Sequence, residues 1–316
     1  MRYGRGRWGA QLWGLGMAER PAAITRLLHD FGLSDHEPLG SGQEAEIYGL
    51  DGGRVLRVYR RATDVTHLER MAGFYGALER GAATFATPSV LDWGVRNGVS
   101  FSVERRIGSV SLASPLGRLE GELRRRALRS YVEAAAAIAG LGHPQRVFGE
   151  ILADPPVRAG TWAEFLLARA GAELEQHRGL LDGRVARPDR ALEALGAMVE
   201  AQGPVEPRLV HGDFYPENVL IGESGEVTGV IDFGGLTLIG DAQLDLACAV
   251  FFLTGMESVT PGDRALVRDH ALGLGLREPS LALYRLYYAF RFLGAPREND
   301  GLLRWCAATI AAACGD

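Results

Sequence analysis

The sequence predicts an α+β fold in two parts, a smaller N-terminal part with an antiparallel sheet and a larger, mainly helical C-terminal part. Three observations support this prediction. Short β-branched runs joined by glycine-containing turns occupy residues 39–59 and 88–104. Apolar residues recur at helical spacing from residue 116 onward. One further hairpin pattern, at residues 209–233, interrupts the helices.

We expect the N-terminal part to span residues 18–106 and the C-terminal part residues 107–316. Residues 1–17 precede both, and they are rich in glycine and arginine without a continuous apolar stretch. This composition does not make a convincing signal peptide. Since Met17 looks like an alternative start, we expect residues 1–17 to be a disordered or misannotated extension.

Composition places the chain among soluble globular proteins. It has 316 residues, of which 47% are hydrophobic and 23% charged, with a net charge of -5. That charge gives no basic field for nucleic acid, and no stretch of twenty apolar residues could span a membrane. The three cysteines are odd in number and lack CxxC spacing, which disfavours a disulfide framework or a zinc site. We therefore expect a cytoplasmic protein.

The N-terminal part begins with an amphipathic helix at residues 19–32, followed by a strand, a glycine-containing loop and further strands. The loop contains Gly40, Ser41 and Gly42. A strand–glycine loop–strand arrangement lets backbone N–H groups approach phosphates closely. The spacing is not that of a full G-x-G-x-x-G motif, so the loop is informative only together with the downstream residues.

The remaining elements follow from hydrophobic spacing and turn residues. The predicted strands and helices are a strand at 55–59, a helix at 63–80, strands at 88–94 and 99–104, and helices at 123–140, 161–176, 188–201 and within 262–316. Residues 144–160 are predicted to be a loop.

The most informative stretch runs from His211 to Asp232. Asp213 is followed five positions later by Asn218, and Asp232 closes the predicted hairpin. Two carboxylates and an amide oxygen are hard ligands that suit Mg²⁺, which proteins usually bind through few side chains together with substrate phosphates. His211 lies on the lead-in strand, so we expect it to brace the loop rather than to act as an acid or base.

The spacing His-x-Asp-x-x-x-x-Asn followed by Asp-Phe-Gly matches the catalytic and metal-binding loops of kinases. With the continuation Gly240-Asp241-x-x-x-Asp245, the stretch resembles the aminoglycoside phosphotransferase family, a group of small-molecule kinases with a protein-kinase-like, two-lobed fold. The resemblance covers roughly residues 35–255 and is densest at 209–247. It implies that Asp241 and Asp245 buttress the catalytic loop.

The resemblance also implies roles for individual residues, with ATP and Mg²⁺ as cofactors. Asp213 would orient the acceptor hydroxyl and accept its proton late in a loose transition state. Asn218 and Asp232 would hold Mg²⁺ against the nucleotide phosphates, which Arg57 and the loop Gly40–Gly42 would place. ATP would lie between the two lobes.

Arg57 stands where kinases carry a phosphate-binding lysine, in a chain whose 34 basic residues are all arginine. Two interpretations stay open: Arg57 keeps the role, which we prefer, or activity is weakened or lost. Glu69 is the candidate partner of Arg57 by resemblance, with solvated helix surface as an equal alternative. The segment containing Glu104 and Arg106 resembles the hinge whose backbone binds adenine.

Two functions compete. The first is an ATP-dependent phosphotransferase acting on a small-molecule hydroxyl. Aminoglycosides are the family's namesake, which would imply antibiotic resistance, but macrolides, sugars, choline, homoserine and fructosamines are acceptors for relatives. The second is a kinase-like protein that binds nucleotide without transferring phosphate. Its motivation is Arg57 and the irregular glycine loop.

Overall fold

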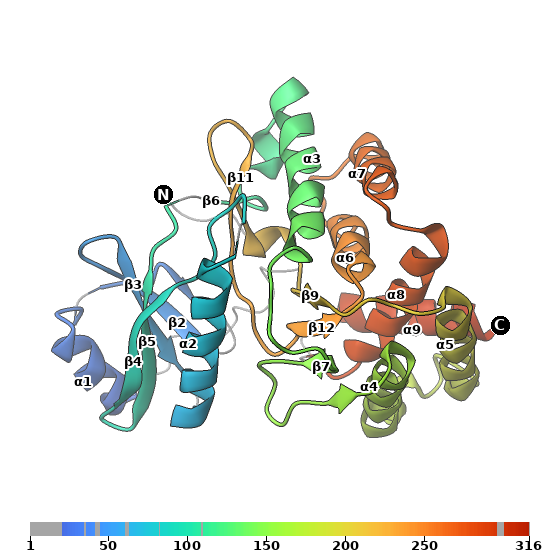
Figure 1. Cartoon of the computed structure of the whole chain (residues 1–316), viewed down its shortest axis with the longest axis horizontal. Helices are drawn as coiled ribbons and strands as arrows, with labels where there is room; N and C mark the ends of the chain where they lie inside the picture. Colours follow the sequence, from blue (N-terminus) through green and yellow to red (C-terminus); the bar gives the residue numbers. More distant parts are fainter. Residues whose placement is uncertain are drawn as a thin grey trace.

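The computed structural model describes residues 21–34, 36–41, 45–60, 63–81, 83–108, 110–295 and 300–315. In these ranges a five-stranded antiparallel sheet with two helices comes first, and helices with short strands between them follow (Figure 1). The arrangement confirms the predicted α+β class with a smaller N-terminal sheet and a mainly helical C-terminal part. The expected extension at residues 1–17 lies outside the described residues, and the boundary at residue 106 stays a prediction.

The N-terminal sheet has the strand order β1-β2-β3-β5-β4. Its strands are β1 (Gly40–Ser41), β2 (Ala45–Leu50), β3 (Arg54–Tyr59), β4 (Val90–Arg96) and β5 (Val99–Arg105). Asn97 and Gly98 connect β4 to β5, and both have positive φ angles, 55° and 76°. Two positive φ angles are typical of the type I′ turn, which matches the twist of the strands it joins. Strand β5 pairs with β3 on one side and β4 on the other.

Side-chain alternation gives this sheet two different faces. Leu56 and Val58 of β3 are buried in a cluster with residues of helix α1 (Ala22–Asp30). The other face, which carries Tyr59, packs with helix α2 (Val65–Glu79) into the large core of the C-terminal part. Helix α2 therefore lies between the sheet and the rest of the molecule (Figure 1).

Two small antiparallel sheets position the central stretch. One contains β11 (Val227–Val230), β10 (Val219–Ile221) and β6 (Val110–Ser111); the other contains β8 (Arg158–Ala159), β7 (Phe148–Glu150), β12 (Leu238–Gly240) and β9 (Arg208–Val210). The β10–β11 hairpin confirms the prediction. Strands β7 and β8 correct the predicted loop at 144–160. Because they have three and two residues, and β7 also pairs with the distant β12, no local pattern marks them.

The helices of the C-terminal part agree with the hydrophobic spacing. They are α3 (Gly121–Ile138), α4 (Trp162–His177), α5 (Pro188–Gln202), α6 (Gln243–Leu253), α7 (Pro261–Gly273), α8 (Glu278–Arg291) and α9 (Asp300–Cys314). Thr161 and Glu164 form a capping box at the start of α4, in which each side chain accepts the other's backbone N–H. The buried faces of these helices join one large hydrophobic core around β9, β10 and β12.

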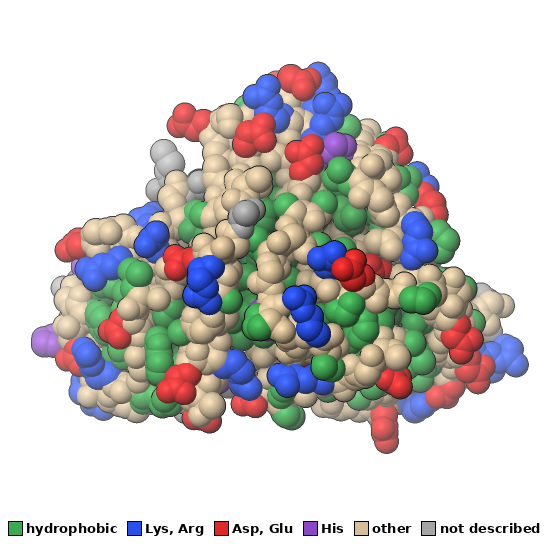
Figure 2. Space-filling model, viewed as in Figure 1, with side chains coloured by type: hydrophobic (Ala, Val, Ile, Leu, Met, Phe, Trp, Pro, Cys, Tyr) green, Lys and Arg blue, Asp and Glu red, His purple; other side chains and the backbone are tan. Residues whose placement is uncertain are grey.

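Within the described ranges, every helix is too short or too polar to cross a lipid bilayer. On the face drawn in Figure 2, arginine and acidic side chains are interspersed over both parts of the molecule. That face therefore has no large basic surface of the kind that follows a nucleic acid backbone.

Candidate active site

The backbone of the loop that follows β9 is held by a buried carboxylate. Asp245, near the start of α6, is 1% exposed and accepts the backbone N–H groups of His211 at 2.7 Å and Gly212 at 3.0 Å. Burial raises the pKa of Asp245 to about 7, although the two N–H groups oppose this shift. The expected buttressing by Asp245 is thus present as direct hydrogen bonds to the loop.

The carbonyl groups of the same loop are held by side chains from three other elements. Thr237 donates its hydroxyl to the carbonyl of His211 at 3.1 Å, and Tyr131 donates to that of Phe214 at 2.9 Å. Tyr288 donates to the carbonyl of Gly212. The aromatic residues of α8 are buried, and the bonding role of their hydroxyl groups was not predicted. No local pattern identifies such contacts, because the partners are backbone atoms far away in the chain.

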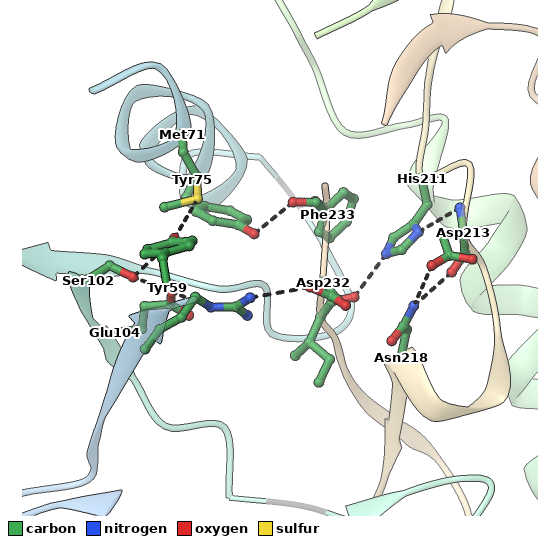
Figure 3. Close-up of polar contacts among 12 residues, drawn as sticks. Tyr59, Met71, Tyr75, Ser102, Glu104, His211, Asp213, Asn218, Asp232 and Phe233 are labelled. Carbon is green, nitrogen blue, oxygen red and sulfur yellow. Dashed lines mark hydrogen bonds and ion pairs between the residues drawn. The ribbon is translucent and has the colours of Figure 1, made fainter. Parts of the chain in front are cut away.

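His211 is a neutral structural brace, as expected. It is fully buried, its Nδ1 accepts the N–H of Asp213 at 3.2 Å, and its Nε2 donates to the carbonyl of Ile231 at 2.9 Å. Burial lowers the pKa of His211 to about 4, so the ring is uncharged at neutral pH. Its ring packs 4.4 Å from that of Phe233 (Figure 3). One imidazole thus ties the 211–214 loop to the end of β11.

Gly212 allows the loop to approach the segment before β12. Its φ is 77°, and a Cβ atom there would lie 2.0 Å from the carbonyl oxygen of Leu236. Both the positive φ and this contact exclude a side chain.

Asp213 and Asn218 lie side by side in the loop. The amide nitrogen of Asn218 donates to the carbonyl of Asp213 at 2.9 Å and is 3.4 Å from its Oδ2 (Figure 3). These bonds use the nitrogen and leave the amide oxygen, the atom that could bind a metal ion. Asp213 is partly exposed, as a group that meets a substrate has to be.

The β10–β11 hairpin brings Asp232 to the same place. Val219 pairs with Val230, and the N–H of Ile231 donates to the carbonyl of Asn218 at 2.8 Å. Asp232 follows directly with a φ of 65° and a side chain that is 52% exposed. The positive φ turns the chain so that Phe233 is buried, while its carbonyl accepts the hydroxyl of Tyr75 at 2.9 Å.

Arg57 reaches this group from the N-terminal sheet. Its Nη1 lies 3.5 Å from Oδ1 of Asp232, and its Nε lies 3.1 Å from Oε1 of Glu104. Burial alone would lower the pKa of Arg57, but Glu104 and Asp232 hold it well above its ordinary value. The structure therefore joins Arg57 of the sheet and Asp232 of the hairpin in one ion pair.

The expected partner of Arg57, Glu69, is not the residue with which it pairs. Glu69 is exposed on α2, so the alternative interpretation of Glu69 as solvated helix surface is the correct one. The physical reason is helical spacing: Leu68, Met71 and Tyr75 form the buried side of α2, and Glu69 points away from it.

The structure describes only some of the other residues that are candidates for nucleotide binding. Gly40 and Ser41 form β1 and pair with Ile47 and Glu46 of β2, whereas Gly42 lies outside the described residues. The N–H of Arg106 already donates to the carbonyl of Gly53 at 2.8 Å, so that N–H is not free to bind a base. Contacts of the glycine loop with phosphates, and of the Glu104–Arg106 backbone with adenine, stay predictions.

Glu217 is a site residue that the sequence did not single out. It lies between Pro216 and Asn218, and burial raises its pKa to about 7, with the charge of Asp213 acting in the same direction. Its Oε2 atom is buried without a hydrogen-bond partner among the described residues. A buried carboxylate without a partner lowers the free energy of unfolding, so Glu217 destabilises this loop.

The donor set can be compared with the needs of Mg²⁺. Among the described residues, no group of three or more His, Cys, Asp or Glu side chains could hold a metal ion by itself. Asn218 and Asp232 are hard oxygen donors on neighbouring ends of one hairpin, which fits an ion bound by few protein groups plus phosphates. A surface cavity of about 410 Å³ between Arg178 and Arg190 is lined by none of these residues.

A model of the phosphotransferase enzyme family matches residues 35–284 of the chain. The chain belongs to this family. Its expected enzyme class, a phosphotransferase with an alcohol group as acceptor, is thereby confirmed. A search of curated proteins gave no match.

Solved structures of aminoglycoside phosphotransferases have the same fold. The ADP-bound APH(2'')-Ib has 15% sequence identity and a TM-score of 0.60, covering 92% of this chain and 99% of that one. The GDP complex of aminoglycoside 2'-phosphotransferase-IIIa has 16% identity and a TM-score of 0.62, covering 94% and 99%. APH(3'')-Id from Streptomyces rimosus with ADP and streptomycin has 17% identity and a TM-score of 0.52, covering 93% and 99%. At these identities the matches establish the two-lobed, kinase-like fold alone.

Proposed function

We propose that this phosphotransferase transfers the γ-phosphoryl group of ATP to a hydroxyl group of a small molecule. The observation that carries the proposal is the convergence of Asp213, Asn218 and Asp232, two of them joined by a hydrogen bond and the third paired with Arg57. Phosphoryl transfer requires positioning and charge neutralisation more than strong acid–base chemistry. A loop whose backbone groups are fixed by several side chains supplies such positioning.

Each residue has a separate task in this proposal. Asp213 accepts a hydrogen bond from the acceptor hydroxyl, orients it and takes its proton as the new oxygen–phosphorus bond forms and the bond from the γ-phosphorus to the leaving ADP breaks. Asn218 and Asp232 would hold Mg²⁺, which would supply positive charge to offset that of the phosphates. Arg57 donates to the phosphate oxygens, and the loop Gly40–Gly42 offers backbone N–H groups.

The acceptor is proposed as a chemical class, from the ligands of proteins with the same fold. The similar solved structures include complexes with gentamicin, streptomycin or kanamycin, and with ADP, ATP or GDP as nucleotide. We therefore propose aminoglycosides as the first acceptors to test, which would make the protein an antibiotic-modifying enzyme. The acidic net charge of -5 is compatible with a cationic acceptor.

A second candidate function is nucleotide binding without transfer. The Arg57–Asp232 contact favours it, because an arginine that occupies a metal-binding carboxylate competes with the metal ion. Against it stands Asp213, the proposed base, which a protein that only binds nucleotide would not need.

One assay separates the two functions. Purified protein is incubated with Mg²⁺-ATP or Mg²⁺-GTP and a panel of aminoglycosides, macrolides, sugars and amino alcohols, and acceptor-dependent nucleoside diphosphate release is measured. Release that disappears in Asp213→Ala supports the phosphotransferase. Nucleotide binding without release on any acceptor in the panel favours the binding protein.

A further inference from the structure

Arg57 is supported by a neighbouring strand of the sheet. Arg57 on β3 lies opposite Ser102 on β5, and Glu104 follows two positions later on the same face. The carboxylate of Glu104 is 6% exposed, lies 3.1 Å from Nε of Arg57 and accepts the hydroxyl of Ser102 at 2.8 Å. Glu104 is thus a buried carboxylate that is itself oriented by a hydrogen bond.

Helix α2 fills the space above this pair with other side chains. The hydroxyl of Tyr59 donates to Sδ of Met71 at 3.2 Å, and Tyr75 donates to the carbonyl of Phe233 (Figure 3). Met71 and Tyr75 of α2 are buried, whereas Glu69 of the same helix is exposed. In protein kinases the corresponding lysine pairs with a glutamate of a helix. Here the buried side of α2 brings a thioether and a phenol to this region.

We propose that Glu104 is the positioning residue that holds Arg57 for the nucleotide phosphates, with the sheet replacing the helix as the source of the supporting carboxylate. The inference rests on the proposed function, because it assigns a helper to the phosphate-binding arginine. Strands β3 and β5 are hydrogen-bonded along Arg54 to Val58, so the two charged side chains keep a fixed spacing. The position of Arg57 then does not depend on the position of α2.

The same geometry explains how Arg57 can contact Asp232 and still serve the nucleotide. Its Nε lies 3.1 Å from Oε1 of Glu104 as an ion pair without hydrogen-bond geometry, while Nη1 donates to the half-exposed Asp232 at the longer distance of 3.5 Å. Because the contact between Arg57 and Glu104 is buried, it persists when phosphates bind Nη1 of Arg57 and a metal ion binds Asp232. Without the charge of Glu104, the guanidinium of Arg57 would pair only with Asp232, and this pairing would hinder the binding of a metal ion to Asp232.

The test is a double-mutant cycle on the full chain, read out as the dissociation constant for Mg²⁺-ATP by calorimetry. Glu104→Gln keeps the shape and removes the charge, and we expect it to raise the dissociation constant by about tenfold or more. In an Arg57→Ala background the same change should have an effect within about twofold, because the residue acts through Arg57. Glu104→Gln should also raise the Mg²⁺ concentration needed for half-maximal turnover.

Controls separate positioning from simple stability. Glu79→Gln alters an exposed glutamate of α2 and should leave the dissociation constant unchanged. Ser102→Ala removes the hydroxyl that orients Glu104 and that lies 3.5 Å from the hydroxyl of Tyr59. It tests the pair even where Glu104→Gln fails to fold, and we expect the dissociation constant to rise about two- to fivefold. The proposal would be overturned if Glu104→Gln changed the dissociation constant equally in the wild-type and Arg57→Ala backgrounds. A larger change in this constant from Glu69→Gln than from Glu104→Gln would also overturn it. Failure of the wild-type protein to bind either Mg²⁺-ATP or Mg²⁺-GTP would instead overturn the proposed function.

Discussion

Asp245 accepts the backbone N–H of His211 at 2.7 Å, although the two residues are 34 positions apart in the chain. The carboxylate reaches the loop from helix α6, whose other residues are almost all buried. Asp245 therefore attaches the 211–214 loop to helix α6, in addition to the hydrogen bonds from Thr237, Tyr131 and Tyr288. This relationship makes Asp245 the first residue on which the site's geometry can be tested.

Asp245→Asn should lower turnover more than it lowers nucleotide affinity. The amide keeps one acceptor oxygen but replaces the other with a donor, which would face the N–H of His211 or Gly212. A misplaced loop costs turnover steeply, so we expect a loss of about tenfold to a hundredfold in kcat. Steady-state kinetics against Asp269→Asn, an exposed aspartate of α7, provide the comparison. Wild-type kcat in Asp245→Asn would contradict the role.

Asp213→Ala should reduce turnover by orders of magnitude while nucleotide binding survives. Asp213 would contact the acceptor hydroxyl and the reacting atoms, whereas the phosphates would be held by other residues. The measurement is acceptor-dependent release of nucleoside diphosphate, with calorimetry of ADP binding in parallel. Unchanged turnover would remove Asp213 from the mechanism. Loss of ADP binding together with turnover would point to a misfolded loop rather than to lost chemistry.

Asp232→Ala should separate metal-dependent from metal-independent nucleotide binding. Removing this carboxylate eliminates a proposed Mg²⁺ ligand and at the same time frees Nη1 of Arg57. The affinity for Mg²⁺-ADP should therefore fall, while the affinity for ADP in the presence of a chelator should be unchanged or higher. Calorimetry under both conditions is the measurement. Full affinity for Mg²⁺-ADP would show that Asp232 is not a metal ligand.

Glu217→Gln should stabilise the protein, and the gain should depend on pH. The folded pKa of Glu217, about 7, lies above its ordinary value of 4.5, so wild-type stability falls as pH rises between these two values. At pH 8 the neutral glutamine should therefore increase the free energy of unfolding by about 1 to 3 kcal/mol. At pH 4 the glutamic acid is mostly protonated in both states, so the gain should fall close to zero.

Denaturant unfolding of both proteins at pH 4 and pH 8, without metal ions, tests this prediction. The exposed Glu79→Gln serves as the control at both pH values. A gain of the same size at pH 4 and pH 8 would mean that the charge of Glu217 is not its cause.

Much of the fold could be predicted from the sequence, because local patterns of residues indicate most of its strands and helices. Glycine-containing turns and β-branched runs marked the N-terminal strands, and apolar spacing marked the long helices. Strands β7, β8 and β12 were missed or assigned to a loop, since a strand of two or three residues has no period to detect. The capping box of Thr161 and Glu164 is a local device, and its residues were visible in the chain.

The candidate site was predicted unevenly for a similar reason. Asp213, Asn218 and Asp232 lie on one hairpin, so spacing along the chain was enough to group them. The sequence left open whether Glu69 pairs with Arg57 or lies on the solvated surface of its helix, because a helix glutamate and a strand glutamate are equally possible partners from sequence alone. The bonds from Tyr131 and Tyr288 to the loop could not be predicted, since tyrosines at helical spacing indicate only a buried face.

The sequence by itself determined the chemistry that the site offers: one candidate base, two oxygen donors and one candidate cation for phosphate. Only the tertiary structure decided how these groups are held. Strand register places Glu104 rather than Glu69 beside Arg57, and helix packing brings Asp245 under the loop. The physical reason is that residue types and short-range spacing are properties of the chain, whereas ion pairs between distant residues depend on which faces pack together.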